Sequence, residues 1–189
     1  MSISPRQALL GSQAKQGLSS ESAVSSGSTL LNLALTDSPL VAFRKGGYYY
    51  LVGDSQSGKT WLSMSCFAEA CRNPEFKDYR LIFDDVEGGA QMDIGLYFGK
   101  EVARRLEAPS YDKKTPVMSD TVESFYYHIF DLLEEGRPFI YVLDSQDALT
   151  SSAAEGKFRQ QKEAAESGKE SAGSYGDGKA KYHSEHLRV

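Results

Sequence analysis

Lys59 and Thr60 place an ammonium group beside a hydroxyl, a pair that can act on a phosphate. They end a segment that fits the phosphate-binding pattern G-x-x-x-x-G-K-[ST] in full. In such a loop the glycines let successive N–H groups converge on phosphate oxygens, the lysine reaches the β- and γ-phosphates, and the hydroxyl holds Mg²⁺. We therefore expect a nucleotide site for ATP and Mg²⁺ at the start of a helix. Its residues are Gly53, Asp54, Ser55, Gln56, Ser57, Gly58, Lys59 and Thr60.

Two acidic residues are candidates to complete this chemistry. Asp144 ends an apolar run, where a carboxylate can orient Mg²⁺ through its water shell. Glu87 follows another apolar run and is the candidate general base for an attacking water, so that Glu87 and Lys59 form the expected catalytic pair. Three nearby aspartates compete for the role of the base, and for the first two we expect only the solvation of a loop. They are Asp84, Asp85 and Asp93.

The elements next to the loop have clear signals. An aromatic and apolar stretch at residues 48–52 predicts a buried strand directly before the loop. Helical spacing continues after the loop as far as Arg72, because Asn73-Pro74 cannot continue a helix. We expect the tyrosines of the strand, and Trp61 of the helix, to lie in the core.

The rest of the chain continues this alternation of strands and helices, which is typical of an α/β fold with a parallel sheet flanked by helices. In such sheets ligands bind at the carboxyl ends of the strands, so we expect Gly53, Glu87 and Asp144 to converge on one site. The last strand is almost unbroken in its apolarity, which predicts burial on both faces. The expected elements are strands at 80–85 and 139–144, helices at 92–106 and 122–135, and a polar connector at 109–119.

Composition bounds the class of protein. With 189 residues, of which 40% are hydrophobic, the chain is long enough for about one domain with a real core. Its net charge of −5 means that any contact with nucleic acid must be local. Cys66 and Cys71 show neither disulfide nor metal spacing. Because no apolar run approaches the length of a membrane span, we expect a cytoplasmic protein without membrane contact.

Three regions differ in composition. Residues 1–27 are rich in Ser, Gln, Ala and Gly and predict a flexible N-terminal arm. Residues 28–150 form the expected core, which begins with a short helix capped by Ser28 or Thr29. Residues 151–189 are rich in Gly, Ser, Ala, Lys and Glu and predict a second flexible segment, with the start of a following helix at its end.

With these residues in place, the chain resembles the RecA-type recombinase family, in particular its bacteriophage members. The resemblance covers most of the chain from about Ser28, and it rests on the glycine loop, on F-D-D-V-E at residues 83–87 and on the run at residues 139–150. It implies that Glu87 is the catalytic base and Asp144 the Walker B residue. It also implies ATP hydrolysis between neighbouring subunits, a helical filament of many copies on single-stranded DNA, and DNA strand exchange in a bacterial or phage-infected cell. The N-terminal arm could then pack on the next subunit.

In that family a mobile DNA-binding loop follows the Walker B strand. Residues 173–183 of this chain have glycines for close approach, lysines for phosphate charge and tyrosines that can stack on bases. A flexible solvated linker fits the same composition nearly as well. The candidate DNA-binding residues are Tyr175, Lys179, Lys181 and Tyr182.

The pattern of strands stops early. No strand-like apolar run follows Leu149, whereas open sheets of this kind usually carry about five or six strands. We therefore expect an incomplete sheet, with Val189 as a truncation point. Unpaired backbone groups in such a sheet predict low stability or aggregation.

Two alternatives share the nucleotide residues. A replicative helicase of the DnaB type, or a helicase loader, would form a ring rather than a filament. A non-hydrolysing nucleotide switch would bind ATP without turnover. The substitution Glu87→Gln separates the switch from the enzymes, because an enzyme should lose turnover by orders of magnitude and still bind ATP.

Overall fold

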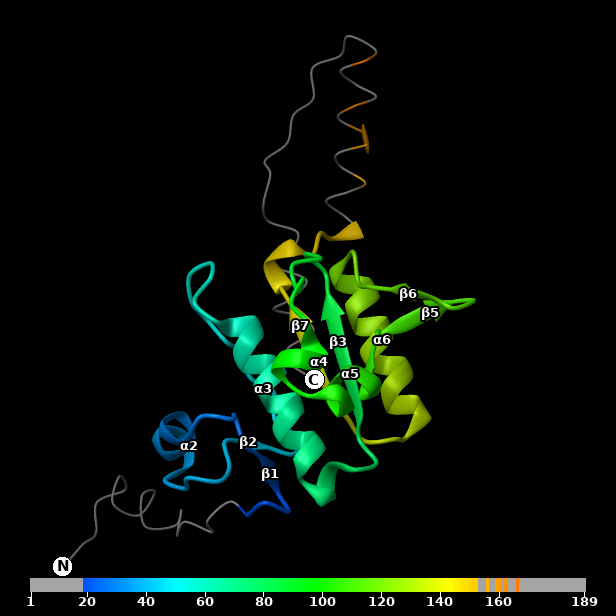
Figure 1. Ribbon diagram of the computed structural model, residues 1–189. Helices are drawn as coiled ribbons and strands as arrows, with labels where there is room; N and C mark the ends of the chain where they lie inside the picture. The colour runs from blue at the N-terminus through cyan, green and yellow to red at the C-terminus, as the bar shows by residue number, and fades with distance from the viewer. Residues whose placement is uncertain (1–18, 153–155, 157–158, 161, 163–165, 167–189) are drawn as a thin grey trace, which may run out of the picture. The chain divides into compact units, whose positions relative to one another are not determined.

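A computed structural model describes residues 19–152, 156, 159–160, 162 and 166 of the chain (Figure 1). The chain forms two compact units. Unit 1 comprises Met1–Lys77 and Ile94–Val102, and unit 2 comprises Asp78–Asp93 and Ala103–Val189. Each unit is therefore built from two separate stretches of sequence.

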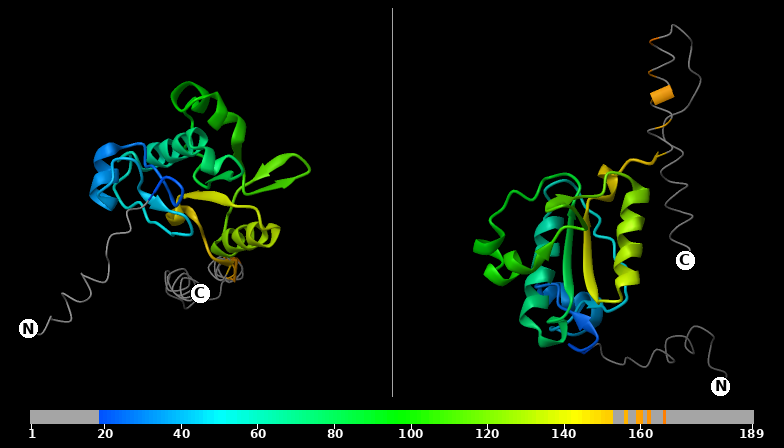
Figure 2. Two further views of the ribbon diagram at one scale, coloured as in Figure 1. Left: turned by 90° about the horizontal axis from the view of Figure 1, so that it is seen from below. Right: turned by 90° about the vertical axis from the view of Figure 1, so that its right-hand side faces the viewer.

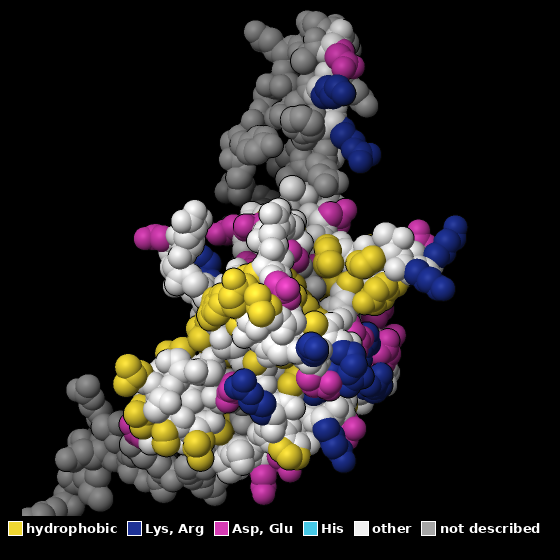
Figure 3. Space-filling view, in the orientation of Figure 1, with side chains coloured by type: hydrophobic (Ala, Val, Ile, Leu, Met, Phe, Trp, Pro, Cys, Tyr) yellow, Lys and Arg dark blue, Asp and Glu magenta, His cyan; other side chains and the backbone are white. Residues whose placement is uncertain are grey.

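The helix α2 (Thr29–Thr36) lies near the start of unit 1. Ser28 caps it, as one of the two predicted caps, because its side-chain oxygen accepts the N–H of Leu31 at 3.4 Å. The helix ends at Asp37, whose left-handed φ of 57° brings its N–H to the carbonyl of Leu33. Hydrophobic side chains remain on the surface around α2 (Figure 3). They are Leu30, Leu33, Leu35 and Leu40.

Two short strands flank α2 in the sequence. β1 (Ala23–Val24) pairs antiparallel with β2 (Phe43–Arg44), and both residues of β1 are buried. The range 1–27, predicted as a flexible arm, therefore contains an ordered strand in its described part. Residues 1–18 lie outside the part of the chain that the structure describes.

The helix α3 (Lys59–Arg72) follows the glycine loop and ends where the sequence predicted. Asn73 leads from it into the 3₁₀ helix η1 (Pro74–Phe76), because proline fits a first helical turn but not a helix interior. Within unit 1, α3 contacts β1 and η1. Gly27 approaches α3 so closely that a Cβ on it would lie 2.8 Å from Cβ of Ser65.

Residues 48–52 do not form the predicted buried strand. They carry no strand pairing, and 92% of the surface of Val52 is exposed. Tyr49 instead folds back over the preceding turn, where its hydroxyl accepts the N–H of Arg44 at 2.8 Å and its ring contacts Phe43 at 4.9 Å between centroids. A strand needs a neighbouring ladder to satisfy its backbone groups, and no strand of the described sheets pairs with this segment.

A parallel sheet with the strand order β4-β3-β7 forms the centre of unit 2. β3 (Arg80–Asp85) and β7 (Phe139–Asp144) have the predicted bounds and pair along their whole length. β4 (Leu106–Glu107) pairs with the other edge of β3 and was not predicted. β7 is half-buried at every residue rather than covered on both faces, and within the described residues it pairs with β3 alone.

The helix α6 (Val122–Glu135) runs alongside β3 and β7 (Figure 2). Thr121 and Ser124 cap its first turn reciprocally, each side chain accepting the other residue's backbone N–H. Gly136 ends it with a left-handed φ of 68°. The 3₁₀ helix η2 (Gln146–Ala148) follows β7. The buried residues that join α6 to the sheet and to the segment after β7 are Val122, Phe125 and Leu149, with Val86, Ile129 and Leu143 packed against them.

The helix predicted over residues 92–106 is two short helices, α4 (Ile94–Tyr97) and α5 (Lys100–Arg105). Gly99 lies between them with a φ of 105°, a backbone conformation that ends a helix and that glycine adopts without strain. The apolar spacing predicted the helical character of this region, but it did not reveal the break.

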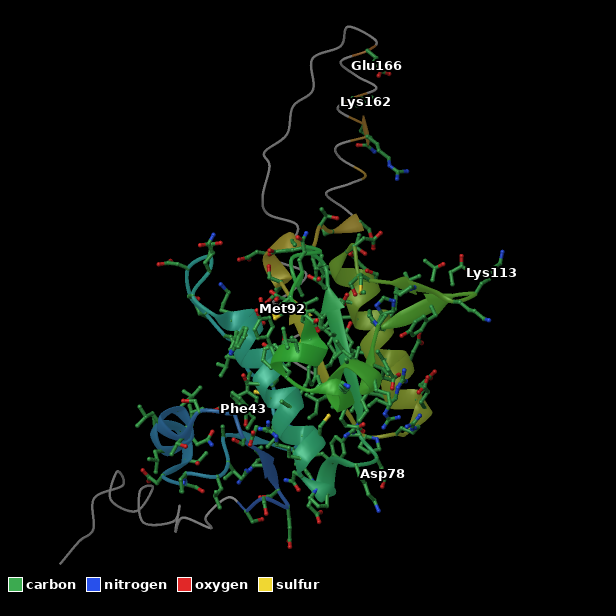
Figure 4. All side chains as sticks on the ribbon, viewed as in Figure 1. Phe43, Asp78, Met92, Lys113, Lys162 and Glu166 are labelled. Carbon is green, nitrogen blue, oxygen red and sulfur yellow. The ribbon has the colours of Figure 1, made fainter. Side chains whose placement is uncertain are left out.

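The polar connector predicted at residues 109–119 contains a hairpin. β5 (Ser110–Asp112) pairs antiparallel with β6 (Thr115–Val117). Lys113, at the tip of this hairpin, has a left-handed φ of 60° and points away from the rest of unit 2 (Figure 4). A two-residue turn of this kind requires positive φ, which the sequence Asp112 to Thr115 does not announce with a glycine.

The structure is thus mixed α/β, with a small parallel sheet and helices beside it. The strand expected at residues 48–52 is not among the strands of this sheet, and the RecA-like form of the sheet stays a prediction. In the described part of the chain, no helix has both the length and the apolar character needed to cross a membrane. Within the range 151–189, the described residues 152, 156, 159, 160, 162 and 166 are helical.

Candidate functional site

The loop of residues 53–58 closes around the side chain of Lys59. The Lys59 ammonium donates hydrogen bonds to the carbonyls of Gly53 and Asp54, each at 2.9 Å. The N–H of Ser57 donates to the Asp54 carbonyl at 3.2 Å and tightens the turn. The loop and the lysine therefore form one compact group at the start of α3.

Two glycines take positions in this loop that a side chain would disturb. Gly58 directly precedes α3 and has a left-handed φ of 92°. A Cβ on Gly53 would lie 2.7 Å from Oγ of Ser57, closer than real side chains approach. The first turn of α3, with Thr60 in it, presents backbone N–H groups at the positive end of the helix dipole. These features fit a nucleotide phosphate, because backbone N–H groups and an ammonium are its usual partners.

An aromatic cluster adjoins the first turn of α3 within unit 1. Trp61, which the sequence placed in the core, has 47% of its surface exposed. Its ring contacts Tyr97 at 5.4 Å and Phe98 at 4.7 Å between centroids. The prediction that Trp61 lies in the core is therefore wrong, since its indole packs on two rings but stays partly open to solvent.

Glu87 and Asp144 lie together at the carboxyl ends of β3 and β7 in unit 2. Asp85, the last residue of β3, stands opposite Asp144 in the register of the sheet. The N–H of Glu87 donates to the Asp144 carbonyl at 3.4 Å. The hydroxyl of Ser145 donates a hydrogen bond to the Glu87 carboxylate. Two carboxylates and one hydroxyl therefore share one end of the sheet.

Asp84 is fully buried, which corrects the expectation that it solvates a loop. Its carboxylate accepts the N–H of Ser119 at 2.9 Å, the hydroxyl of Ser119 at 2.6 Å and the hydroxyl of Tyr141 at 2.6 Å. Nδ1 of His128 lies 3.0 Å from the same Ser119 hydroxyl. Burial, and then the charge of Asp84, raise the pKa of Tyr141 above its ordinary value, so the phenol stays protonated as a donor. Strand alternation gives no signal for this residue, because β3 is buried on both faces from Leu81 to Asp84.

The predicted site residues fall in both units. Lys59 and Thr60 belong to unit 1, whereas Glu87 and Asp144 belong to unit 2. Gly53 does not follow a strand, and its convergence with the two acids stays a prediction. The candidate DNA-binding residues at positions 175, 179, 181 and 182 lie outside the described residues.

Comparisons with known proteins identify no relative. No protein-family model matches the chain, and neither a curated protein nor a solved structure matches it. A proposal on function therefore depends on the residues themselves and on the geometry of each unit.

Proposed function

We propose that this chain is a RecA-like P-loop ATPase that binds ATP and Mg²⁺ and hydrolyses ATP in contact with single-stranded DNA. One observation carries the nucleotide part of the proposal. The loop at residues 53–58 is folded around the Lys59 ammonium, and it opens directly into the 14-residue helix α3. A chance Gly/Ser turn would not be expected to hold a lysine in this way.

Binding begins with an exchange of partners at Lys59. Its ammonium now donates to two neutral carbonyls, and a phosphate oxygen is a stronger acceptor because it is charged. The ammonium can therefore turn from the loop to the β- and γ-phosphates while the loop N–H groups hold the same anion. Thr60 and Asp144 are the candidate ligands of Mg²⁺. When it is bound, this ion would neutralise part of the phosphate charge.

Glu87 supplies the base for hydrolysis in this proposal. It is an exposed carboxylate at the carboxyl end of the sheet, where the ligands of parallel α/β sheets bind. A water held by this carboxylate gives up a proton to it as the water oxygen attacks the γ-phosphorus. The bond between that phosphorus and the β–γ bridging oxygen breaks, ADP leaves, and inorganic phosphate is formed.

The DNA part of the proposal rests on the resemblance to RecA-type recombinases. It assigns Tyr175 and Tyr182 to base stacking and Lys179 and Lys181 to phosphate contacts. Several copies of the chain would assemble as a helical filament on the strand and drive homologous pairing in the cytoplasm.

Binding and turnover of ATP test this proposal separately. Fluorescence of a labelled ATP analogue measures binding, and release of phosphate with and without a single-stranded oligonucleotide measures turnover. We expect Lys59→Ala to weaken binding at least about tenfold, because it removes the ammonium that contacts the phosphates. We expect Glu87→Gln to retain binding and to lose about 10²–10³ in turnover.

Two exposed residues elsewhere in the chain provide matched controls. Lys100→Ala and Glu75→Gln change exposed residues outside the loop and the strand ends, and both should behave as the unchanged chain. Unaltered binding in Lys59→Ala would remove the nucleotide assignment. Turnover that the oligonucleotide does not stimulate would count against the recombinase part, and closed rings in electron microscopy would favour a helicase of the DnaB type.

A further inference from the structure

The loop after β3 is fixed at its backbone by Asp85. The Asp85 carboxylate accepts the N–H groups of Gly89 at 3.0 Å and Ala90 at 3.1 Å, and its carbonyl accepts the N–H of Gly88 at 3.1 Å. These bonds hold the loop as a tight turn at the end of the strand. They leave the orientation of the Glu87 side chain undetermined, because that side chain is exposed.

Ser145 supplies the missing constraint. Within the described residues, the side chain of Glu87 makes one hydrogen bond, in which its Oε1 accepts the Ser145 hydroxyl. Ser145 directly follows β7. The backbone N–H of Glu87 donates to the carbonyl of Asp144, the residue before Ser145. The serine and the glutamate are thus brought together by the register of β7 against β3, which sets Asp85 opposite Asp144.

We infer that Ser145 is a positioning residue for the base of the hydrolysis proposed above. An exposed glutamate samples several rotamers, and a base acts only from the few that reach the water. The Ser145 hydroxyl donates a hydrogen bond to Oε1 of Glu87 and so favours one of these rotamers. Oε2 of Glu87 then remains to accept the proton from water. This role rests on the proposed function, since it requires that Glu87 is the base.

Two substitutions of Ser145 separate its hydroxyl from its bulk. Ser145→Ala removes the donor, and Ser145→Thr keeps it. We expect Ser145→Ala to lower kcat about tenfold, with the dissociation constant of labelled ATP unchanged within about twofold, because the rotamer affects the chemical step alone. Ser145→Thr should restore kcat to within about threefold of the unchanged chain. The control Ser110→Ala, at a half-buried position on β5, should leave both quantities unchanged.

A double-mutant cycle with Glu87→Gln gives a readout that a merely structural serine would not produce. If Ser145 acts through Glu87, then Ser145→Ala should cost less than about twofold in the Glu87→Gln background, measured by single-turnover release of labelled phosphate. A tenfold loss in both backgrounds, or no loss in the unchanged background, overturns the inference while Glu87 remains the base. Full turnover in Glu87→Gln alone overturns the proposed base and the role of Ser145 with it. Circular dichroism of each variant confirms that the fold is retained.

Discussion

The Asp84 carboxylate collects three hydrogen-bond donors in a position that solvent does not reach. Buried charges are tolerated only when they are paired or well hydrogen-bonded, because removal from water costs several kcal/mol. Asp84 lies on β3, Tyr141 lies on β7, and Ser119 precedes α6, so this one carboxylate holds three elements together. Its neighbour Asp85 is half-buried at the end of the same strand, and its carboxylate binds backbone N–H groups of the loop that follows.

Removal of one of the three donors to Asp84 should lower the stability of the fold. We expect Tyr141→Phe to lower the free energy of unfolding by about 1–2 kcal/mol, because the ring packing is kept and the bond to a buried charge is lost. Tyr127→Phe is the matched control, since Tyr127 is 66% exposed on α6, and it should change stability by less than about 0.5 kcal/mol. Urea unfolding followed by circular dichroism measures both. Equal effects would show that the bond seen at Asp84 contributes nothing.

Burial also controls the chemistry of Cys66. Burial, and then the charge of Glu69, raise the pKa of the Cys66 thiol from 9.0 to about 12. Because the thiolate is the reactive form, a shift of this size lowers reactivity near pH 8 on the order of a thousandfold. In the variant Cys71→Ser, we expect a thiol reagent to label Cys66 slowly in the folded chain and rapidly in urea. Fast labelling without urea would contradict the burial of this thiol.

The same shift links stability to pH. Between pH 9 and about 12 the unfolded chain loses the Cys66 proton while the folded chain keeps it. The folded state then binds more protons, so this contribution to stability is fully present below pH 9 and is lost as the pH rises toward 12. Cys66→Ala should remove this part of the alkaline dependence, as measured by unfolding at pH 8 and pH 10.

At the level of elements, Arg80 joins three of them at the start of the sheet. From β3 it donates to Glu107 of β4 at 2.7 and 2.9 Å and to Glu135 of α6 at 2.6 Å. Burial disfavours the charge of Arg80, but the two glutamates outweigh it and hold the pKa of the guanidinium above its ordinary value. The planar guanidinium presents its donors in a fixed fork, so two of its N–H groups bond Glu107 while a third bonds Glu135.

We expect Arg80→Ala to lower the free energy of unfolding by about 1–2 kcal/mol, because it removes the link between β4, β3 and α6. Arg72→Ala is the control, because Arg72 makes a single salt bridge to Glu69 on the surface of α3, and its loss should cost less than about 0.5 kcal/mol. Chemical unfolding of both variants checks the comparison. Equal losses of unfolding free energy in the two variants would mean that the Arg80 contacts stabilise the fold no more than a surface ion pair does.

Long elements with marked ends could be predicted from the sequence. Asn73-Pro74 stops α3, and Gly136 separates α6 from β7, so their bounds follow from local chemistry. β4 has two residues, too few to show a period, and it exists only through its hydrogen bonds to β3. Residues 48–52 show the opposite case, because side-chain type predicted a strand while the ladder that would complete it is absent from the described sheets.

The candidate site divides in the same way. The glycine loop and the acids at positions 87 and 144 could be located from a motif and from strand ends. Ser145 and the buried state of Asp84 could not be located, because both depend on the register of β7 against β3 and on the face to which each residue points. Asp84 and Asp85 look equal in the sequence, and only the folded strand buries the first completely and the second in part.

At the scale of the whole molecule, the exposed segment at residues 48–52 is open to test. We expect Val52→Asp to change the free energy of unfolding by less than about 0.5 kcal/mol, because the side chain is 92% exposed, and to lower light scattering of concentrated samples. Val122→Asp is the control, since this side chain is fully buried and an unpaired charge there should cost at least about 3 kcal/mol or prevent folding. A comparable loss in Val52→Asp would mean that this segment is a buried strand after all.

The order in which the chain visits its two units limits how it can be taken apart. Ile94–Val102 returns to unit 1 after Asp78–Asp93 has begun unit 2. A fragment that stops at Lys77 would lack the rings of Tyr97 and Phe98 that contact Trp61 beside the glycine loop. Neither unit can therefore be produced from one uninterrupted stretch of the chain. A single proteolytic cut after Lys77 would not separate the two units, because Ile94–Val102 of unit 1 would remain in the fragment that carries unit 2.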